Sequence, residues 1–324
     1  KIAGLINRGF TNTITIVDHA GEIQQLKSYT SRKIKIGIRI ASEEEPKFEF
    51  YTSRLGIGYR DVLPFYKTNI KDDPQLDMTM LHFFINTGIN DNAYYWNELS
   101  KCLKVLSGLK QLCPSLRALN IGGGFPIKTS LNFNYDYEYL TEEIINLIKN
   151  ECDENDVETP DIYTEFGSFT VGESGAVLFR ILTQKQQNDR EKWNLIDSSF
   201  MTTLPDTWAT NKRFVMLPLN RWEETYERVF LGGITCDSDD YYNSEQHVNA
   251  IYLPTYRKDK PLYIGFFNTG AYQDTIGGVG GLHHCLIPDP QHVLIDRDEN
   301  DQLTYRVFAE EQNEKTMLDI LGYK

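Results

Sequence analysis

The alternation of strand-like and helix-like segments in the first half of the chain constrains the fold more than any other feature of the sequence. Residues 33–40 read KIKIGIRI, so isoleucines recur at every second position and face one side of an extended strand. Further strand and helix candidates lie at residues 13–17, 78–85, 96–113, 116–121, 135–149 and 162–165. Strands that alternate with helices are typical of parallel strands joined by crossover helices. The pattern predicts an α/β fold with a partial TIM-type (β/α)8 barrel, and an open doubly wound sheet is the alternative.

The pattern changes after about residue 210. From residue 213 onward short strand-like runs follow one another, and Asp298–Asp301 reads as a hairpin turn between the last two. We therefore expect two domains, a barrel over residues 1–210 and a C-terminal, β-rich domain over residues 211–324.

The first residues of the sequence are typical of the end of a helix. Ile2, Leu5 and Ile6 have helical spacing and precede Gly9, a residue common at helix C-termini. No N-cap precedes this pattern, so we expect that an N-terminal segment is missing from the sequence.

Composition and charge exclude several classes of protein. Of the 324 residues, 40% are hydrophobic and 24% are charged, which is typical of soluble globular proteins. The net charge of −13 argues against nucleic acid or an anionic membrane as a partner, because both favour a basic surface. The sequence contains neither an apolar run long enough to span a membrane nor a recognisable signal peptide.

The cysteine and histidine pattern indicates neither a disulfide framework nor a metal site. The five cysteines are widely spaced and form no CxxC pair, which favours the reducing cytoplasm. His283, His284 and Cys285 are adjacent, but neighbouring side chains on extended backbone point in opposite directions, so we expect no metal there.

Three consecutive glycines, Gly122, Gly123 and Gly124, follow the strand candidate at residues 116–121. Glycine lets backbone N–H groups approach an anion closely, so a phosphate group fits such a turn. The alternative is a tight turn between a strand and a helix that binds nothing.

Four other side chains suited to chemistry follow predicted strands. Glu165 ends one strand, where a barrel places catalytic carboxylates; a surface acid is the alternative. Cys236 and Asp237 offer a thiol that transfers a proton and a carboxylate that binds a cation; an acidic turn with a buried cysteine is the alternative. The hydroxyl of Tyr272 is able to donate to a phosphate, and a core or rim tyrosine is the alternative.

Six segments of the chain occur in the order seen in the ornithine, diaminopimelate and arginine decarboxylases that use pyridoxal 5'-phosphate (PLP). They are Gly37–Arg39 with Ser53–Gly56, Leu81–Thr87, Gly122–Gly124, Glu165–Ser168, Cys236–Asp237 and Gly270–Tyr272. Together they cover nearly the whole chain, which therefore resembles this family with the alanine-racemase-like fold. Residues 204–208, 234–239 and 264–273 are similar to its biosynthetic arginine decarboxylase branch in particular.

The resemblance implies a PLP cofactor and a role for each matching residue around it. Glu165 would pair with the pyridine nitrogen and keep it protonated, which makes the ring an electron sink. Arg39 and Phe84 would lie against the ring, and Thr87 stands where the family has a phosphate-binding serine. The other groups at the phosphate would be Gly122, Gly123, Gly124, Ser168 and Tyr272.

The resemblance also implies the substrate and the assembly. Cys236 would return a proton to the α-carbon, and Asp237 would meet the cationic end of a basic amino acid. In this family the two residues serve the active site of the neighbouring subunit, so a homodimer with shared sites is implied. The expected reaction is decarboxylation of L-arginine to agmatine in polyamine biosynthesis. The alternatives are ornithine, lysine or diaminopimelate as the substrate, and a non-catalytic decarboxylase-like binding protein.

The chain departs from the family pattern at three positions. No segment matches the lysine that forms the Schiff base with PLP, and we expect it in the missing N-terminal segment. Phe84 aligns with a ring-stacking histidine of the family, and we interpret His82 as a core histidine whose hydrogen bonds are satisfied. Ser168 aligns with a phosphate-binding arginine, and the loss of that charged donor weakens phosphate binding by about 1–2 kcal/mol.

Overall fold

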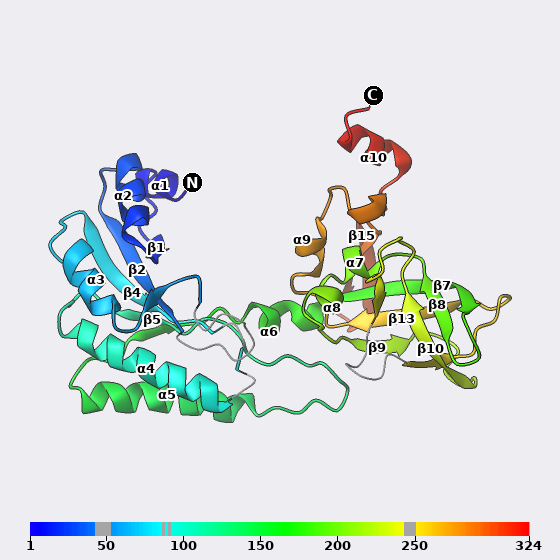
Figure 1. Cartoon of the computed structure of the whole chain (residues 1–324), viewed down its shortest axis with the longest axis horizontal. Coiled ribbons are helices and arrows are strands. Elements are labelled where there is room, and N and C mark those ends of the chain that lie inside the picture. Colours follow the sequence, from blue (N-terminus) through cyan, green and yellow to red (C-terminus); the bar gives the residue numbers. More distant parts are fainter. Residues whose placement is uncertain (43–52, 86–87, 90–91, 243–250, 324) are drawn as a thin grey trace. The chain divides into compact units, whose positions relative to one another are not determined.

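The computed structural model describes residues 1–42, 53–85, 88–89, 92–242 and 251–323 (Figure 1). The chain forms two compact units, which are described separately. The first unit consists of Lys1–Ile127 and Asn134–Phe169, and the second consists of Lys128–Phe133 and Thr170–Lys324.

The first unit alternates strands and helices, as the sequence predicts. Its elements are α1 (Ile2–Asn7), β1 (Ile14–Val17), α2 (Ala20–Tyr29), β2 (Ile34–Ala41), β3 (Ile57–Gly58), α3 (Val62–Asn69), β4 (Leu76–His82), α4 (Asn92–Lys110), β5 (Ala118–Asn120), α5 (Tyr137–Glu154) and β6 (Asp161–Tyr163). The short helix α6 (Gly167–Val171) continues from this unit into the second.

Parallel pairing joins these strands in the order β1-β2-β4-β5-β6, and the two-residue strand β3 pairs with β2. Each strand on this path therefore lies beside the one that precedes it along the chain. A doubly wound sheet reverses its strand order at a switch point, whereas a barrel adds its strands in sequence. The order confirms the predicted partial barrel and excludes the doubly wound alternative.

The alternating isoleucines of β2 build the core of this unit. All four of them, Ile34, Ile36, Ile38 and Ile40, expose 1% or less of their surface. They pack with buried residues of α4 and α5 such as Leu103 and Ile148, and these two helices lie side by side (Figure 1). Full burial of each such side chain contributes about 1.5–3 kcal/mol. One face of β2 is thereby committed to the core, and the opposite face carries Arg39.

The second unit is mostly β, as expected for the C-terminal part of the chain. Its strands are β7 (Ala176–Gln186), β8 (Lys192–Ile196), β9 (Val215–Pro218), β10 (Tyr226–Gly232), β11 (Tyr241–Tyr242), β12 (Ile251–Pro254), β13 (Leu262–Phe267), β14 (His292–Arg297) and β15 (Leu303–Ala309). Its helices are the 3-10 turns η1 (Gly172–Ser174) and η2 (His284–Leu286), with α7 (Phe200–Thr203), α8 (Asp206–Ala209), α9 (Gln273–Gly277) and α10 (Glu314–Ile320).

One sheet contains most of these strands, in the order β11-β10-β8-β7-β13-β9, with β12 on β10. Its core holds aromatic residues, and the ring centroids of Phe179 and Phe266 lie 5.7 Å apart. A separate antiparallel hairpin joins β14 to β15 through the predicted turn at Asp298–Asp301, where the N–H of Asp301 donates to the carbonyl of Asp298.

The division between the two units falls between Phe169 and Thr170, earlier than the boundary that we expect near residue 210. The strands β7 and β8 account for the difference. β7 pairs antiparallel with β13, and β8 pairs with β10, so both belong to the second sheet. Neither strand is among those expected from the sequence, so the start of the second sheet is not visible there.

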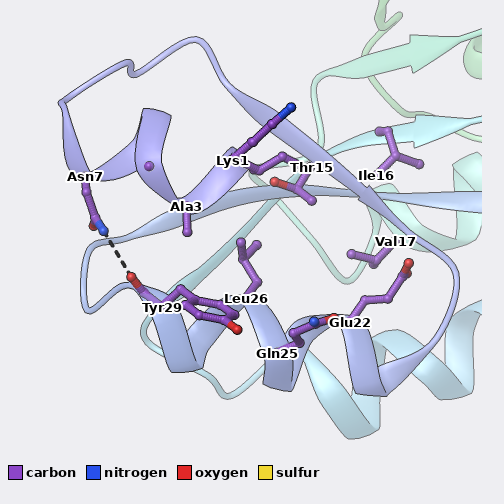
Figure 2. Close-up of a pocket in the computed structure, with 12 residues that line it drawn as sticks. Lys1, Ala3, Asn7, Thr15, Ile16, Val17, Glu22, Gln25, Leu26 and Tyr29 are labelled. Atoms are coloured by element: carbon purple, nitrogen blue, oxygen red, sulfur yellow. Dashed lines mark hydrogen bonds between the residues drawn. The ribbon is translucent and has the colours of Figure 1, made fainter. Parts of the chain in front are cut away.

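A cavity of about 610 Å³ lies among α1, β1 and α2 in the first unit (Figure 2). Ile16, Val17 and Leu26 line it, and the side-chain amide of Asn7 donates to the carbonyl of Tyr29 beside it at 3.0 Å. None of the candidate site residues lines this cavity, so it does not mark the site. Among the described residues no helix combines the length and the apolar composition needed to cross a membrane.

Candidate active site

The carboxyl ends of β4, β5 and β6 bring three polar side chains together. His82 is the last residue of β4, and it pairs in register with Asn120, the last residue of β5. Asn120 in turn pairs with Tyr163 at the end of β6, two residues before Glu165. Because parallel strands end at the same edge of a sheet, His82, Asn120 and Glu165 become neighbours although they are far apart in the sequence.

Asn120 links the carboxylate of Glu165 to the glycine turn. Its Nδ2 donates to Oε1 of Glu165 at 2.8 Å, and its Oδ1 accepts from the N–H of Gly122 at 2.8 Å. The backbone N–H of Glu165 donates to the carbonyl of Gly122, also at 2.8 Å. A buried amide that uses both its donor and its acceptor in this way fixes the carboxylate and the turn as one assembly.

The glycine triplet is required by space as well as by conformation. Gly122 and Gly124 have positive φ angles of 70° and 99°, which side-chain-bearing residues rarely adopt. A Cβ on Gly123 would lie 2.8 Å from the carbonyl oxygen of Glu165. Within the part of the chain that the structure describes, the N–H groups of Gly123 and Gly124 donate to no acceptor. The turn therefore presents two backbone donors beside Glu165, which is suited to binding an anion.

The Glu165 side chain is 51% exposed, whereas His82 beneath it is buried. Nε2 of His82 lies 3.4 Å from Oε1 of Glu165, but neither ring nitrogen makes a hydrogen bond to any described residue. His82 is therefore a buried histidine, as expected, but the expectation that its hydrogen bonds are satisfied is wrong. Burial lowers the pKa of His82, Arg39 lowers it further and Glu165 opposes the shift, so the ring is neutral at neutral pH.

The residues expected beside the ring occupy neighbouring positions in the first unit. Arg39 of β2 pairs in register with His82, and its guanidinium carbon lies 5.3 Å from the centroid of the Phe84 ring. Ser168 lies in α6, three residues after Glu165. Thr87 lies outside the described residues. The structure thus brings Arg39 and Phe84 to the strand ends that carry Glu165.

Aromatic stacking anchors the glycine turn, and this stacking is not predicted from the sequence. The rings of Phe125 and Phe166 stack with centroids 3.9 Å apart and planes 7° apart. Phe125 follows the last glycine and Phe166 follows Glu165, so the stack joins the two loops of the site. The hydroxyl of Tyr137 donates to the carbonyl of Pro126 at 2.8 Å. Phenylalanines placed directly after both functional segments are the only sequence signal of this anchor.

The other candidate residues, Cys236, Asp237 and Tyr272, belong to the second unit. Cys236 is exposed, so the alternative of a buried cysteine in an acidic turn does not hold. Tyr272 is 60% exposed and has a φ angle of 71° at the start of α9, so it is not a core tyrosine. Their expected convergence with Glu165 around one cofactor stays a prediction.

A buried hydrogen-bonded pair supports the segment that carries Tyr272. The amide nitrogen of Gln273 donates to the Asp206 carboxylate at 2.8 Å, and its amide oxygen accepts from the backbone N–H of Asp206 at 3.2 Å. Asp206 also forms an ion pair with Lys212 at 3.6 Å. Gln273, the residue that follows Tyr272, is thus fixed by hydrogen bonds to Asp206 in α8.

A partial barrel that carries a carboxylate and a glycine turn suited to an anion at its strand ends is typical of cofactor-binding barrel proteins. Residues 6–172, slightly more than half of the chain, match the family model of the pyridoxal binding domain of pyridoxal-dependent decarboxylases. The chain therefore belongs to the family of pyridoxal-dependent decarboxylases, whose cofactor is PLP.

Curated relatives agree with this family. The biosynthetic arginine decarboxylase of Prochlorococcus marinus (strain MIT 9215) is 21% identical over 442 aligned positions, which cover 100% of this chain and 68% of the relative. The enzyme of that name from Proteus mirabilis (strain HI4320) is 32% identical over 148 positions, which cover 44% of this chain and 22% of the relative.

Solved structures share the fold. Diaminopimelate decarboxylase from Helicobacter pylori, complexed with L-lysine, superposes with a TM-score of 0.80 at 16% identity, covering 99% of this chain and 75% of that one. The biosynthetic arginine decarboxylase from Campylobacter jejuni superposes with a TM-score of 0.76 at 19% identity, covering 100% of this chain and 68% of that one. At these identities the similarity establishes the barrel with its β domain and leaves the substrate open.

Proposed function

We propose that the full-length natural protein decarboxylates L-arginine to agmatine with PLP, as a step of polyamine biosynthesis. The observation that supports this most directly is the assembly of Glu165, Asn120 and the Gly122–Gly124 turn at the strand ends of a PLP-decarboxylase domain. PLP, when bound, supplies an electron sink for the electron pair that remains when carbon dioxide departs.

The described residues fit both polar ends of PLP. The N–H groups of Gly123 and Gly124 offer donors to a phosphate, and the nearby Ser168 offers an uncharged hydroxyl. That the Tyr272 hydroxyl also donates to this phosphate is part of the proposal. The Glu165 carboxylate, oriented by Asn120, holds a proton on the pyridine nitrogen. Phe84 offers a flat apolar face for the ring, and the guanidinium carbon of Arg39 lies 5.3 Å from the centroid of the Phe84 ring.

The second unit supplies the groups for the substrate in this proposal. The exposed Cys236 thiol donates a proton to the α-carbon after carbon dioxide has left, and Asp237 binds the cationic end of the substrate. We further propose that the protein is a homodimer in which these two residues complete the site of the partner subunit, as the family resemblance implies.

The choice of arginine rests on the names of the sequence relatives, several of which are biosynthetic arginine decarboxylases that align over the whole chain. A carboxylate such as Asp237 accepts guanidinium and ammonium groups alike, so ornithine, lysine and diaminopimelate are the competing substrates. Phe84 and Ser168, which replace a histidine and an arginine of the family pattern, favour a second candidate, a non-catalytic decarboxylase-like binding protein.

Release of labelled carbon dioxide from a panel of four amino acids tests the proposal. Full-length protein with PLP should release carbon dioxide from arginine and form agmatine, and it should act more slowly on ornithine, lysine and diaminopimelate. Faster release from one of the other three would reassign the substrate within the class. Cofactor binding without release from any of the four would support the non-catalytic candidate and contradict the proposed activity.

A further inference from the structure

Two exposed thiols of the second unit lie close together although 49 positions separate them in the chain. The Sγ atoms of Cys236 and Cys285 are 3.9 Å apart. Cys236 follows β10, and Cys285 lies in the turn η2. The other three cysteines, Cys102, Cys113 and Cys152, are buried. Only this pair therefore combines solvent access with a neighbouring thiol among the described cysteines.

A histidine and a carboxylate stand beside the pair. Nε2 of His284 lies 3.4 Å from Sγ of Cys285 and 3.7 Å from Oδ2 of Asp237. A neutral imidazole at this position accepts the proton of the Cys285 thiol, and the carboxylate stabilises the resulting cation. The arrangement supplies the base that converts a thiol into the reactive thiolate.

A metal ion does not fit these four groups. In the described part of the chain, no set of three potential ligand atoms that includes either sulfur lies mutually within 4.8 Å. A disulfide requires less, because the two sulfurs must approach by only roughly 2 Å to reach the usual bond length of about 2.05 Å. The geometry is that of a dithiol rather than of a coordination site.

We propose that Cys236 and Cys285 form an oxidation site, at which a peroxide converts the two thiols into a reversible intramolecular disulfide. Nothing in this step requires the decarboxylase reaction. Its consequence for activity rests on the proposed function, since a Cys236 sulfur that is bonded to Cys285 has no proton to return to the α-carbon.

The chemistry balances with hydrogen peroxide as the oxidant. The Cys236 thiolate attacks one peroxide oxygen, the O–O bond breaks, and hydroxide leaves as water with the thiol proton, so a sulfenic acid forms on Cys236. The Cys285 thiolate, whose proton passes to His284, then attacks that sulfur. The S–S bond forms, the S–O bond breaks, and hydroxide takes the proton from His284 and leaves as a second water. The two sulfurs lose two electrons, which reduce the peroxide.

The order of the two steps follows from the surroundings of Cys285. Desolvation is the largest cause that raises the pKa of the Cys285 thiol above its ordinary value, and the neighbouring Cys236 sulfur is the next. Cys285 therefore keeps its proton to a higher pH than an ordinary cysteine does. His284 lies 3.4 Å from the Cys285 sulfur, so we assign Cys285 as the resolving thiol that uses this base and Cys236 as the sulfur that attacks peroxide. Disulfide formation should therefore become faster as the pH rises above neutrality.

Peptide mapping of the full-length protein after treatment with hydrogen peroxide and alkylation of free thiols tests the site. A peptide pair joined through Cys236 and Cys285, two hydrogens lighter than the thiols and released by dithiothreitol, is the expected result. Cys285→Ser should leave Cys236 as a sulfenic acid that dimedone traps, and the buried-thiol control Cys152→Ser should still form the disulfide. His284→Ala should slow its formation by at least about tenfold.

Conversion of Cys236 to sulfinic acid in the parent protein without the linked peptides would overturn the proposal, as would a disulfide between two copies of Cys236. Decarboxylation measured on the same samples separates this proposal from the proposed function. Loss of activity of at least about tenfold, restored by dithiothreitol, supports both the oxidation site and the role of Cys236 in the proposed function. The linked peptides with unchanged activity support the oxidation site and contradict the role of Cys236 in proton return.

Discussion

At the scale of single residues, the site depends on atoms that no catalytic motif contains. Asn120 is the clearest case, because it links the Glu165 carboxylate to the N–H of Gly122 through both ends of its amide. The sequence shows an asparagine directly before three glycines, and that placement alone does not reveal its partner 45 positions later. Gly123 lies against the backbone carbonyl of Glu165 and His82 lies near its carboxylate, and each of these two residues yields a prediction.

Gly123→Ala should damage the site without a charged group being changed. The new Cβ would lie 2.8 Å from the carbonyl oxygen of Glu165, so either the turn or Glu165 must move. We expect a cost of about 1–3 kcal/mol, divided between folding stability and PLP affinity. A PLP titration together with thermal unfolding measures both parts. The control is Gly4→Ala, whose Cβ has no neighbour within 4 Å. Equal PLP affinity in the two variants would contradict the crowded turn.

His82 should make the stability of the first unit depend on pH. Its pKa in the folded protein lies below the ordinary value of 6.5, so the folded ring is neutral while the unfolded chain takes up a proton as the pH falls through that value. Stability is therefore present above pH 6.5 and declines below it, by about 1.4 kcal/mol for each pH unit between the two pKa values.

His82→Gln should remove this part of the decline, which denaturant unfolding at several pH values measures. His19→Gln is the matched control, because the His19 side chain is 65% exposed. A decline below pH 6.5 that is as steep in His82→Gln as in the control would contradict the neutral, buried His82.

At the scale of elements, the sequence predicts many of the strands and helices and misses others, β7 and β8 among them. The pattern at residues 33–40 corresponds to β2, and the expected turn at Asp298–Asp301 joins β14 to β15. Strand identity follows from alternation and β-branched residues, which are local properties. Sheet membership depends on long-range pairing, and because β7 and β8 are not predicted from the sequence, the expected boundary falls too late along the chain.

The candidate site shows the same difference between local sequence signals and long-range contacts. Glu165 and the Gly122–Gly124 turn follow from strand ends and glycine content, and the structure places them in contact. The Phe125–Phe166 stack and the lack of a hydrogen bond at the ring of His82 could not be predicted, because both depend on contacts that form only after the parallel strands pair.

Phe179→Ala should destabilise the second unit and leave the first intact. Phe179 belongs to β7, and its ring packs with centroids 5.7 Å from those of Phe200 and Phe266. We expect a loss of about 3–5 kcal/mol, which is usual for a buried phenylalanine. Hydrogen exchange resolved by mass spectrometry should show lost protection in β13 and unchanged protection in β5.

Leu178→Ala is the control for this variant, since the neighbouring side chain is 62% exposed on the opposite face of β7. It should leave the exchange of both units nearly unchanged. Equal loss of protection in β5 and β13 of the Phe179→Ala protein would contradict the assignment of β7 to the second core.

At the scale of the whole molecule, the proposed site needs residues from both units, and the proposed homodimer supplies them from different chains. Mixing Glu165→Ala with Cys236→Ala subunits tests this. Each parent variant should be inactive, whereas a heterodimer contains one intact site, so a random mixture should regain about a quarter of the parent activity. Recovery should require exchange of subunits, and no recovery after refolding the mixture together would contradict sites that are shared between subunits.

In the proposed function, Glu165 holds a proton on the pyridine nitrogen of PLP bound at the Gly122–Gly124 turn. Nuclear magnetic resonance of PLP labelled at that nitrogen, bound to the full-length protein, reports the proton directly. The parent protein should give the resonance of a protonated pyridine, and Glu165→Gln should move it to that of a neutral one, while Glu173→Gln leaves it in place. A pyridine nitrogen that remains protonated in Glu165→Gln would contradict this role of Glu165.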